Sequence, residues 1–113
     1  MSRHKKRDTW ETQGGHIECG ETAMEAAKRE LYEESGAKET GIYPVCDYLG
    51  YTADGSAFGA VFLADVHELG QLPESEMSEV VLFETLPEEL TYPDVTPVLF
   101  EEARRVAVEK GIL

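Results

Sequence analysis

The stretch Gly14–Ala37 decides how the rest of this chain is interpreted, and it reads GGHIECGETAMEAAKRELYEESGA. Three carboxylates, Glu30, Glu33 and Glu34, follow a glycine-punctuated loop at spacings of three residues and one. In a helix, residues three and four positions apart lie on neighbouring positions of one face. The stretch therefore predicts a loop followed by a helix that gathers acidic side chains.

The apolar side of this predicted helix makes two of the carboxylates unusual. At about 100° per residue, Glu34 points into the apolar stripe and Glu30 lies at its edge. The stripe consists of Ala23, Met24, Ala27 and Leu31. An unpaired buried carboxylate costs several kcal/mol or more, so it must be paired, protonated or bound to a metal. Three such groups repel one another, so a divalent cation would satisfy them better than one arginine.

Local signals mark both ends of the helix. Thr22 is predicted as the N-cap, and Glu25, three residues later, completes a capping box. We expect the helix to run to about Ser35 and to stop at Gly36.

Composition limits the class of protein. The chain has 113 residues, 42% apolar and 29% charged, which predicts one domain over residues 1–113 with a single core. We expect a cytoplasmic protein without a membrane partner, since no apolar run approaches the ~20 residues of a membrane span and no signal peptide opens the chain. Cys19 and Cys46 have no metal-ligand spacing, and we expect both to be reduced.

Charge is distributed unevenly. The net charge is −13, yet Arg3, Lys5, Lys6 and Arg7 supply four of the ten basic residues, leaving 6 basic and 23 acidic residues elsewhere. So acidic a body should repel nucleic acid, which needs clustered basic residues. The basic segment has two interpretations, a flexible arm or a short strand around Arg3–Arg7 whose cations lean toward an anionic substrate.

The remaining elements are predicted from residue composition, hydrophobic pattern and turn residues. Residues 42–69 indicate a β-hairpin with its turn at 53–56. Residues 60–66 are largely apolar on both faces, with Asp65 the exception, which favours a central strand in a sheet covered on both sides. An acidic loop over 70–79 precedes a strand at 80–83 and a helical turn in 86–90. Thr96 is predicted to cap a last helix with Pro97 at its first position and Gly111 after its end. Its apolar face consists of Val98, Leu99, Ala103, Val106 and Ala107.

The central stretch resembles a known signature. The spacing runs Gly15, five residues, Glu21, seven residues, Arg29-Glu30-Leu31, one residue, Glu33-Glu34, one residue, Gly36-Ala37. This matches every fixed position of the Nudix box of the Nudix (MutT-like) hydrolases. Trp10 and Gly14-Gly15 also resemble the W-x-x-P-G-G approach of that family, although Gln13 and Cys19 stand where prolines are frequent.

The resemblance implies an α/β/α sandwich around a mixed β-sheet and a Mg²⁺-dependent, or Mn²⁺-dependent, hydrolase of nucleoside diphosphates linked to another group. It implies that Glu30, Glu33 and Glu34 hold the metal with the carbonyl oxygen of Gly15. Glu30, Glu33 and Arg29 form the implied catalytic group, with Glu30 the general base, and Arg29 and Glu21 look like an ion pair joining loop to helix. The family often adds an acid from a later loop, and Glu76 is the best match, with Glu74 and Glu79 as rivals.

The beginning of the chain departs from the family, whose members usually carry one or two strands before the box. We therefore expect an N-terminally truncated product or a second subunit that covers an open sheet edge, as in a homodimer. The alternatives to a hydrolase on a small nucleotide are a catalytically idle nucleotide-binding or regulatory module and an isomerase on a diphosphate lipid precursor. The isomerases normally use a cysteine outside the box, and Cys46 has no supporting context.

Overall fold

A computed structural model describes residues 1–52 and 55–112 of the chain. Two helices and five strands follow one another in it. In chain order they are β1 (Ser2–His4), β2 (Trp10–Glu11), α1 (Ala23–Ser35), β3 (Ala37–Thr52), β4 (Gly55–Leu69), β5 (Met77–Val80) and α2 (Thr96–Glu109).

The strands form two sheets. One has the order β2-β1-β5, and the other is the β3-β4 hairpin. All these strand pairs are antiparallel, and one isolated parallel bridge joins Trp10 to Leu90. The basic N-terminal segment is therefore a strand, but it covers Ser2–His4 and gives way to a turn before Arg7, because only its first residues find partners in β2 and β5.

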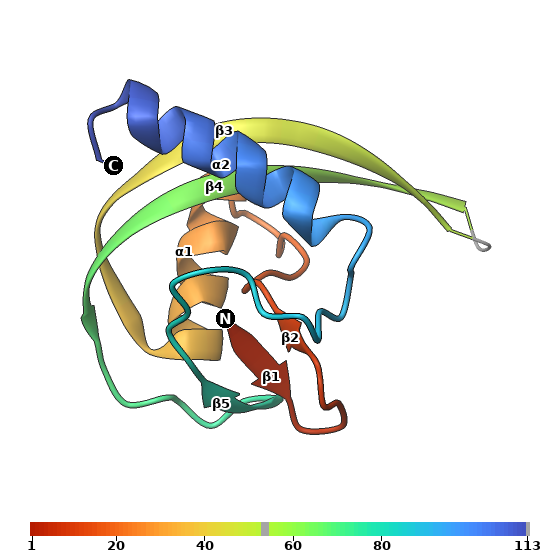
Figure 1. Cartoon of the computed structure of the whole chain (residues 1–113), viewed down its shortest axis with the longest axis vertical. Helices are drawn as coiled ribbons and strands as arrows, with labels where there is room; N and C mark the ends of the chain where they lie inside the picture. The colour runs from red at the N-terminus through yellow and green to blue at the C-terminus, as the bar shows by residue number, and fades with distance from the viewer. Residues whose placement is uncertain (53–54, 113) are drawn as a thin grey trace.

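The long hairpin is covered by a helix on each face. Figure 1 shows α2 in front of β3 and β4 and α1 behind them, and both helices contact both strands. The prediction of two covered faces is confirmed, but the central position of the second strand is wrong, because β4 pairs with β3 alone. Apolar residues on both faces of a strand predict packing above and below the sheet, but they do not predict how many strands pair with it. The centre of the predicted turn, at residues 53 and 54, lies outside the described residues.

Trp10 fixes the segment that follows β5. Its N–H donates to the carbonyl of Glu89 at 2.8 Å, its carbonyl accepts from Thr91 at 2.9 Å, and its ring meets the Phe83 ring edge-on at 5.1 Å. The helical turn predicted for 86–90 is wrong, since this segment is irregular, with a bend at Glu88, and Leu90 forms a bridge with Trp10. The strand predicted at 80–83 lies instead at Met77–Val80, where β1 supplies the partner.

The last helix begins one residue earlier than predicted. Thr96 is its first residue, and Val95 precedes it with helical backbone angles and no side-chain cap. The reason is a turn in which the N–H groups of Val95 and Thr96 both donate to the carbonyl of Tyr92, so the chain is already wound when it enters α2. Ala107 is buried as predicted, whereas Val98 is 61% exposed and lies outside the packed face.

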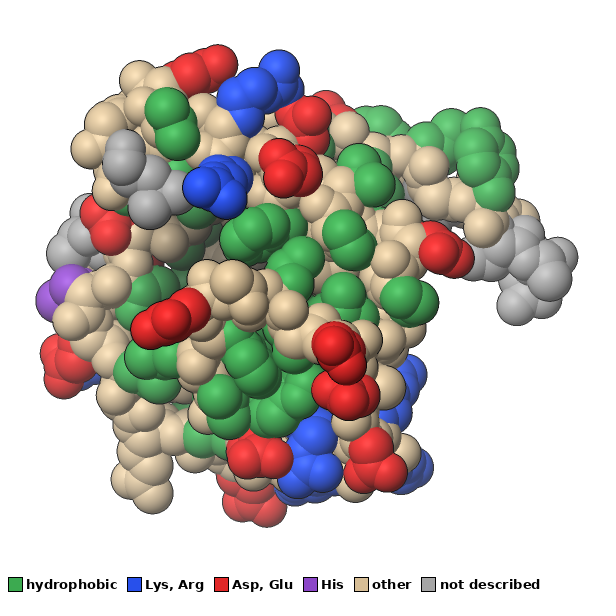
Figure 2. Space-filling model, viewed as in Figure 1, with side chains coloured by type: hydrophobic (Ala, Val, Ile, Leu, Met, Phe, Trp, Pro, Cys, Tyr) green, Lys and Arg blue, Asp and Glu red, His purple; other side chains and the backbone are tan. Residues whose placement is uncertain are grey.

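These elements give the molecule an α/β/α layering around the hairpin. Figure 2 shows hydrophobic side chains gathered at the centre of the face that α2 crosses and along the projecting end of the hairpin, with charged side chains around the margin. Within the described residues, neither helix has the length and apolar character that a membrane span requires.

Candidate metal and catalytic site

The acidic helix is anchored at both ends by local hydrogen bonds. The Thr22 hydroxyl accepts from the Glu25 N–H at 3.1 Å, and the Glu25 carboxylate accepts from the Thr22 N–H at 3.0 Å, so the predicted capping box is confirmed. Gly36 ends the helix at φ 72°, an angle that glycine adopts without strain, and its N–H donates to the Tyr32 carbonyl. The chain then enters β3 directly, which fixes α1 beneath the hairpin.

Arg29 joins the loop to the helix, as the resemblance implied. Its Nε and Nη2 donate to the two carboxylate oxygens of Glu21 at 2.8 and 3.0 Å, and Nη2 also donates to the His16 carbonyl at 3.0 Å. Paired, charge-assisted hydrogen bonds of this kind are strong and directional. They raise the pKa of Arg29 and hold the pKa of Glu21 below its usual range.

The same guanidinium also reaches two of the predicted metal ligands. Its Nη1 donates to Glu30 at 2.9 Å and to Glu33 at 3.2 Å. The expectation that one arginine could not satisfy all three acids is confirmed in an unexpected form. Arg29 satisfies Glu30 and Glu33, and Glu34 receives no bond from it.

Glu34 is held differently. Its carboxylate accepts the Gly14 N–H at 2.7 Å. Burial raises the pKa of Glu34 to about 7, and the nearby negative charges of Glu30, Glu11 and Glu76 add to this effect, while the Gly14 hydrogen bond opposes it. Among the three acids of the box, Glu34 is thus the one whose ionised form is least compensated by its neighbours.

Gly15 lies against Glu30. A Cβ atom at Gly15 would overlap the Glu30 carboxylate, with only 2.6 Å to its Cδ. Glycine at this position therefore lets the loop backbone approach the carboxylate closely, as a shared ligand site requires.

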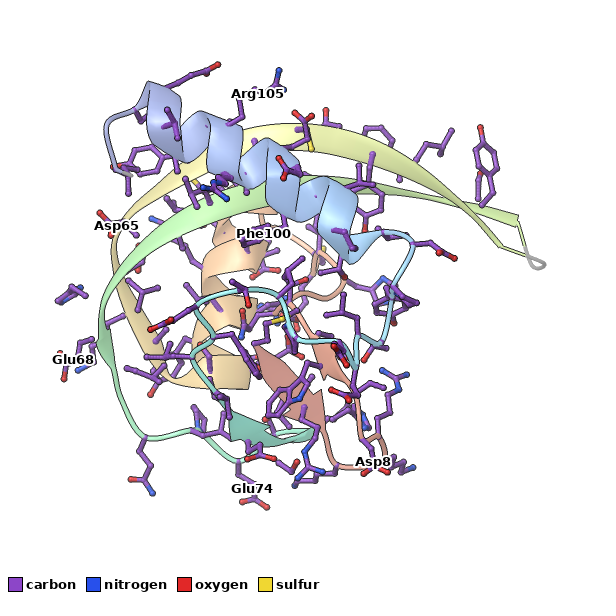
Figure 3. The ribbon with its side chains drawn as sticks, viewed as in Figure 1. Asp8, Asp65, Glu68, Glu74, Phe100 and Arg105 are labelled. Carbon is purple, nitrogen blue, oxygen red and sulfur yellow. The ribbon has the colours of Figure 1, made fainter. Side chains whose placement is uncertain are left out.

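The acids converge on one cavity of about 450 Å³. Its lining residues come from the loop, from α1 and from the segment before β5, and they are Glu18, Arg29, Glu30, Glu33, Glu34, Glu74, Ser75 and Glu76. Of the three rival acids after the box, Glu76 and Glu74 reach the cavity, and Glu74 is labelled at the lower edge of the molecule in Figure 3. Glu79 is instead paired with Arg3 at 2.8 Å.

The donor set fits a hard divalent cation in its chemistry. Carboxylate and carbonyl oxygens are the ligands that Mg²⁺ takes, and a cation would offset both the burial and the neighbouring negative charges that raise the pKa of Glu34. Within residues 1–52 and 55–112, however, no three His, Cys, Asp or Glu side chains already stand together as a coordination group. Glu30 and Glu33 are turned toward Arg29. Binding a cation therefore requires these side chains to exchange Arg29 for the metal.

Sequence reasoning missed two polar groups beside the cavity. Glu11 is nearly buried, pairs with Arg7 at 2.9 Å and contributes to the raised pKa of Glu34. His4 lies 3.4 Å from Glu76. The alternation of Ser2 and His4 along a strand could have signalled that both side chains face the site, since Ser2 donates to the Glu34 carbonyl at 2.8 Å.

Comparison with known proteins agrees with this geometry. A model of the NUDIX domain matches residues 1–105. Among solved structures, the chain is similar to the Bacillus subtilis pyrophosphohydrolase BsRppH, solved as a glutamate-to-alanine mutant. The TM-score is 0.79 and the identity 26%, over 93% of this chain and 72% of that one. A search of curated proteins found no match.

Proposed function

The chain belongs to the NUDIX domain family and is a hydrolase of pyrophosphate bonds, and from this premise we propose that it is a Mg²⁺-dependent enzyme acting on a small nucleotide. The substrate class is a nucleoside diphosphate linked to another group, and Mn²⁺ can replace Mg²⁺. The convergence of the box carboxylates on one cavity with Arg29 carries the proposal. We also propose that residues 1–113 act as one domain in the cytoplasm.

Gly15, Glu30, Glu33, Glu34 and Glu76 would hold the cation. When bound, Mg²⁺ would offset the negative charge of the pyrophosphate and lower the pKa of an attacking water. The cavity supplies no other positive group than Arg29 among its lining residues, so without a cation its carboxylates would repel a phosphate.

Residues of the cavity and its loop would supply the general base and hold the acids in place. Glu30 is the candidate general base, because its carboxylate lies against Gly15 and lines the cavity. Arg29 holds Glu30 and Glu33 in one orientation until a cation takes its place at them, while Glu21 keeps Arg29 anchored to the loop. Cavity walls on three segments would position the diphosphate between loop and helix.

A second candidate is an idle nucleotide-binding module. It is favoured by the contacts of Arg29 with both Glu30 and Glu33, which occupy two predicted ligands. The two functions differ in turnover. A hydrolase releases phosphate products, whereas a binding module is stabilised by the nucleotide and leaves it intact.

Phosphate release from a panel of nucleotides with Mg²⁺ tests the proposal. We expect turnover by the wild type and a loss of about 100-fold or more in Glu34→Gln, since the variant loses an oxygen donor with its charge. Glu101→Gln is the matched control, because Glu101 is an exposed acid of α2. Turnover that is absent in the wild type, or equal in wild type and Glu34→Gln, would contradict the proposal, and nucleotide-induced stabilisation without turnover would select the binding module.

A further inference from the structure

Glu76 stands apart from the other acids of the cavity because its side chain is 83% exposed. A glutamate so exposed samples several rotamers unless a neighbour restrains it. Its main chain is already fixed, since the Lys5 N–H donates to the Glu76 carbonyl at 2.8 Å and β1 pairs with β5 immediately after it.

His4 is the neighbour that meets this carboxylate. It is the last residue of β1, and its side chain is only 18% exposed. Its Nε2 lies 3.4 Å from Oε2 of Glu76. The register of the two strands shifts between Arg3 and His4, and His4 then pairs with Met77, next to Glu76.

The turn after β1 determines which nitrogen faces Glu76 as a donor. The Lys6 N–H donates to Nδ1 of His4 at 3.1 Å. A nitrogen that accepts a hydrogen bond carries no proton in the neutral ring, so the N–H is on Nε2. The Lys6 N–H therefore fixes the orientation of the His4 ring and leaves Nε2 as the nitrogen nearest Glu76, 3.4 Å from its Oε2.

From these contacts we infer that His4 is a positioning residue, which holds Glu76 at the cavity so that its carboxylate can join the box acids around a divalent cation. The inference rests on the proposed function, because Glu76 serves the reaction only if the cavity binds metal. Groups that orient a ligand in this way typically change metal affinity or activity 10–100-fold when lost.

Mn²⁺ binding to the whole chain, followed by the electron paramagnetic resonance of free Mn²⁺, tests the inference without relying on activity. His4→Phe keeps a ring and removes the donor, and we expect it to weaken Mn²⁺ binding about 10-fold. His4→Gln keeps an N–H within reach of Glu76 and should recover most of the affinity. Glu76→Gln should weaken binding as much as His4→Phe, and the double variant should be no weaker than Glu76→Gln alone.

His67→Phe is the matched control, since His67 is an exposed histidine of β4, and it should bind Mn²⁺ as the wild type does. In turnover, His4→Phe should raise the Mn²⁺ concentration needed for half-activation while kcat at saturating Mn²⁺ changes little. A merely structural role would lower kcat or the thermal midpoint instead. If His4→Phe folds poorly, His4→Leu makes the same comparison.

The inference is overturned if His4→Phe binds Mn²⁺ as tightly as the wild type, or if His4→Gln binds as weakly as His4→Phe. If the wild type turns over nucleotides and the Mn²⁺ affinity of His4→Phe equals that of the wild type, the positioning role alone is excluded. A wild type that binds no Mn²⁺ overturns the proposed metal site together with it.

Discussion

Glu34 differs from its two neighbours on α1 in how its charge is met. Glu30 and Glu33 share Arg29, whereas Glu34 has a single backbone N–H, from Gly14, and faces other carboxylates. Burial raises the pKa of Glu34 to about 7, so it is substantially protonated near neutral pH in the absence of a cation. This residue should therefore couple stability, pH and metal binding.

A pH series in the presence of EDTA measures that coupling. The folded pKa of Glu34 lies above its unfolded value of 4.5, so the folded state binds the additional proton. Its effect on stability is most favourable below pH 4.5 and is lost as the pH rises through about 7. We expect the free energy of unfolding of the wild type to fall by roughly 1–2 kcal/mol relative to that of Glu34→Gln between pH 5 and 8. The fall is smaller than the full pKa shift would give, because solvent screens a half-exposed group.

Urea unfolding at each pH provides the measurement. Glu101→Gln, on the exposed side of α2, should differ from the wild type by a constant amount over the same range. A constant difference for Glu34→Gln as well would mean that the Glu34 carboxyl titrates like an exposed acid.

At the scale of the element, α1 depends on its first turn. Thr22 and Glu25 exchange hydrogen bonds that satisfy two N–H groups the helix cannot satisfy itself. We expect Thr22→Ala to lower the free energy of unfolding by about 1 kcal/mol and the thermal midpoint by roughly 4 °C, and Thr22→Ser to restore most of both. Thr85→Ala, at an exposed loop position, should change the midpoint little. An equal effect of the two alanine variants would show that the cap contributes nothing specific.

The elements that could be predicted from sequence are those specified by nearby residues. The cap at Thr22, the stop at Gly36 and the pair of Glu21 with Arg29 all arise within one loop and helix, and all are confirmed. Elements that depend on distant partners were misjudged. The segment 86–90 is irregular and is held at Leu90 by Trp10, some eighty residues earlier. The strand β4 lies beside β3 alone, although both its faces are covered.

The candidate site divides in the same way. The spacing of the box acids predicts that they gather on one face, and they do line one cavity, but the contacts of Arg29 with Glu30 and Glu33 depend on rotamers that spacing does not specify. The approach of His4 to Glu76 depends on the pairing of β1 with β5, which are separated by most of the chain. No local pattern carries that information.

At the scale of the whole molecule, charge restricts where a second copy could bind. The net charge of −13 makes most of the surface repel another chain. The hairpin segment 48–60 is an exception, since Asp54 is its single charged residue. It also exposes large apolar side chains, with Tyr51 80% and Phe58 75% exposed, and Figure 1 shows that this end of the hairpin projects beyond α2.

The open edge suggested by the sequence is therefore not at β1, which has β2 on one side and β5 on the other. Among the described strands, β3 and β4 have only each other, so their outer edges can pair with another chain. If the homodimer expected from the sequence forms, we expect this end of the hairpin to be its contact, because two copies would bury Tyr51 and Phe58 there with little charge repulsion.

Sedimentation velocity at micromolar concentration tests the assembly. We expect a concentration-dependent dimer that strengthens with added salt, because salt screens the repulsion between two acidic bodies. Phe58→Glu should shift the protein to monomer, since it places like charges at the centre of the contact. Val108→Glu adds the same charge at an exposed position of α2 and should leave the dimer intact. A stable, folded monomer at every salt concentration would exclude the dimer, and equal effects of the two variants would place the contact elsewhere on the molecule.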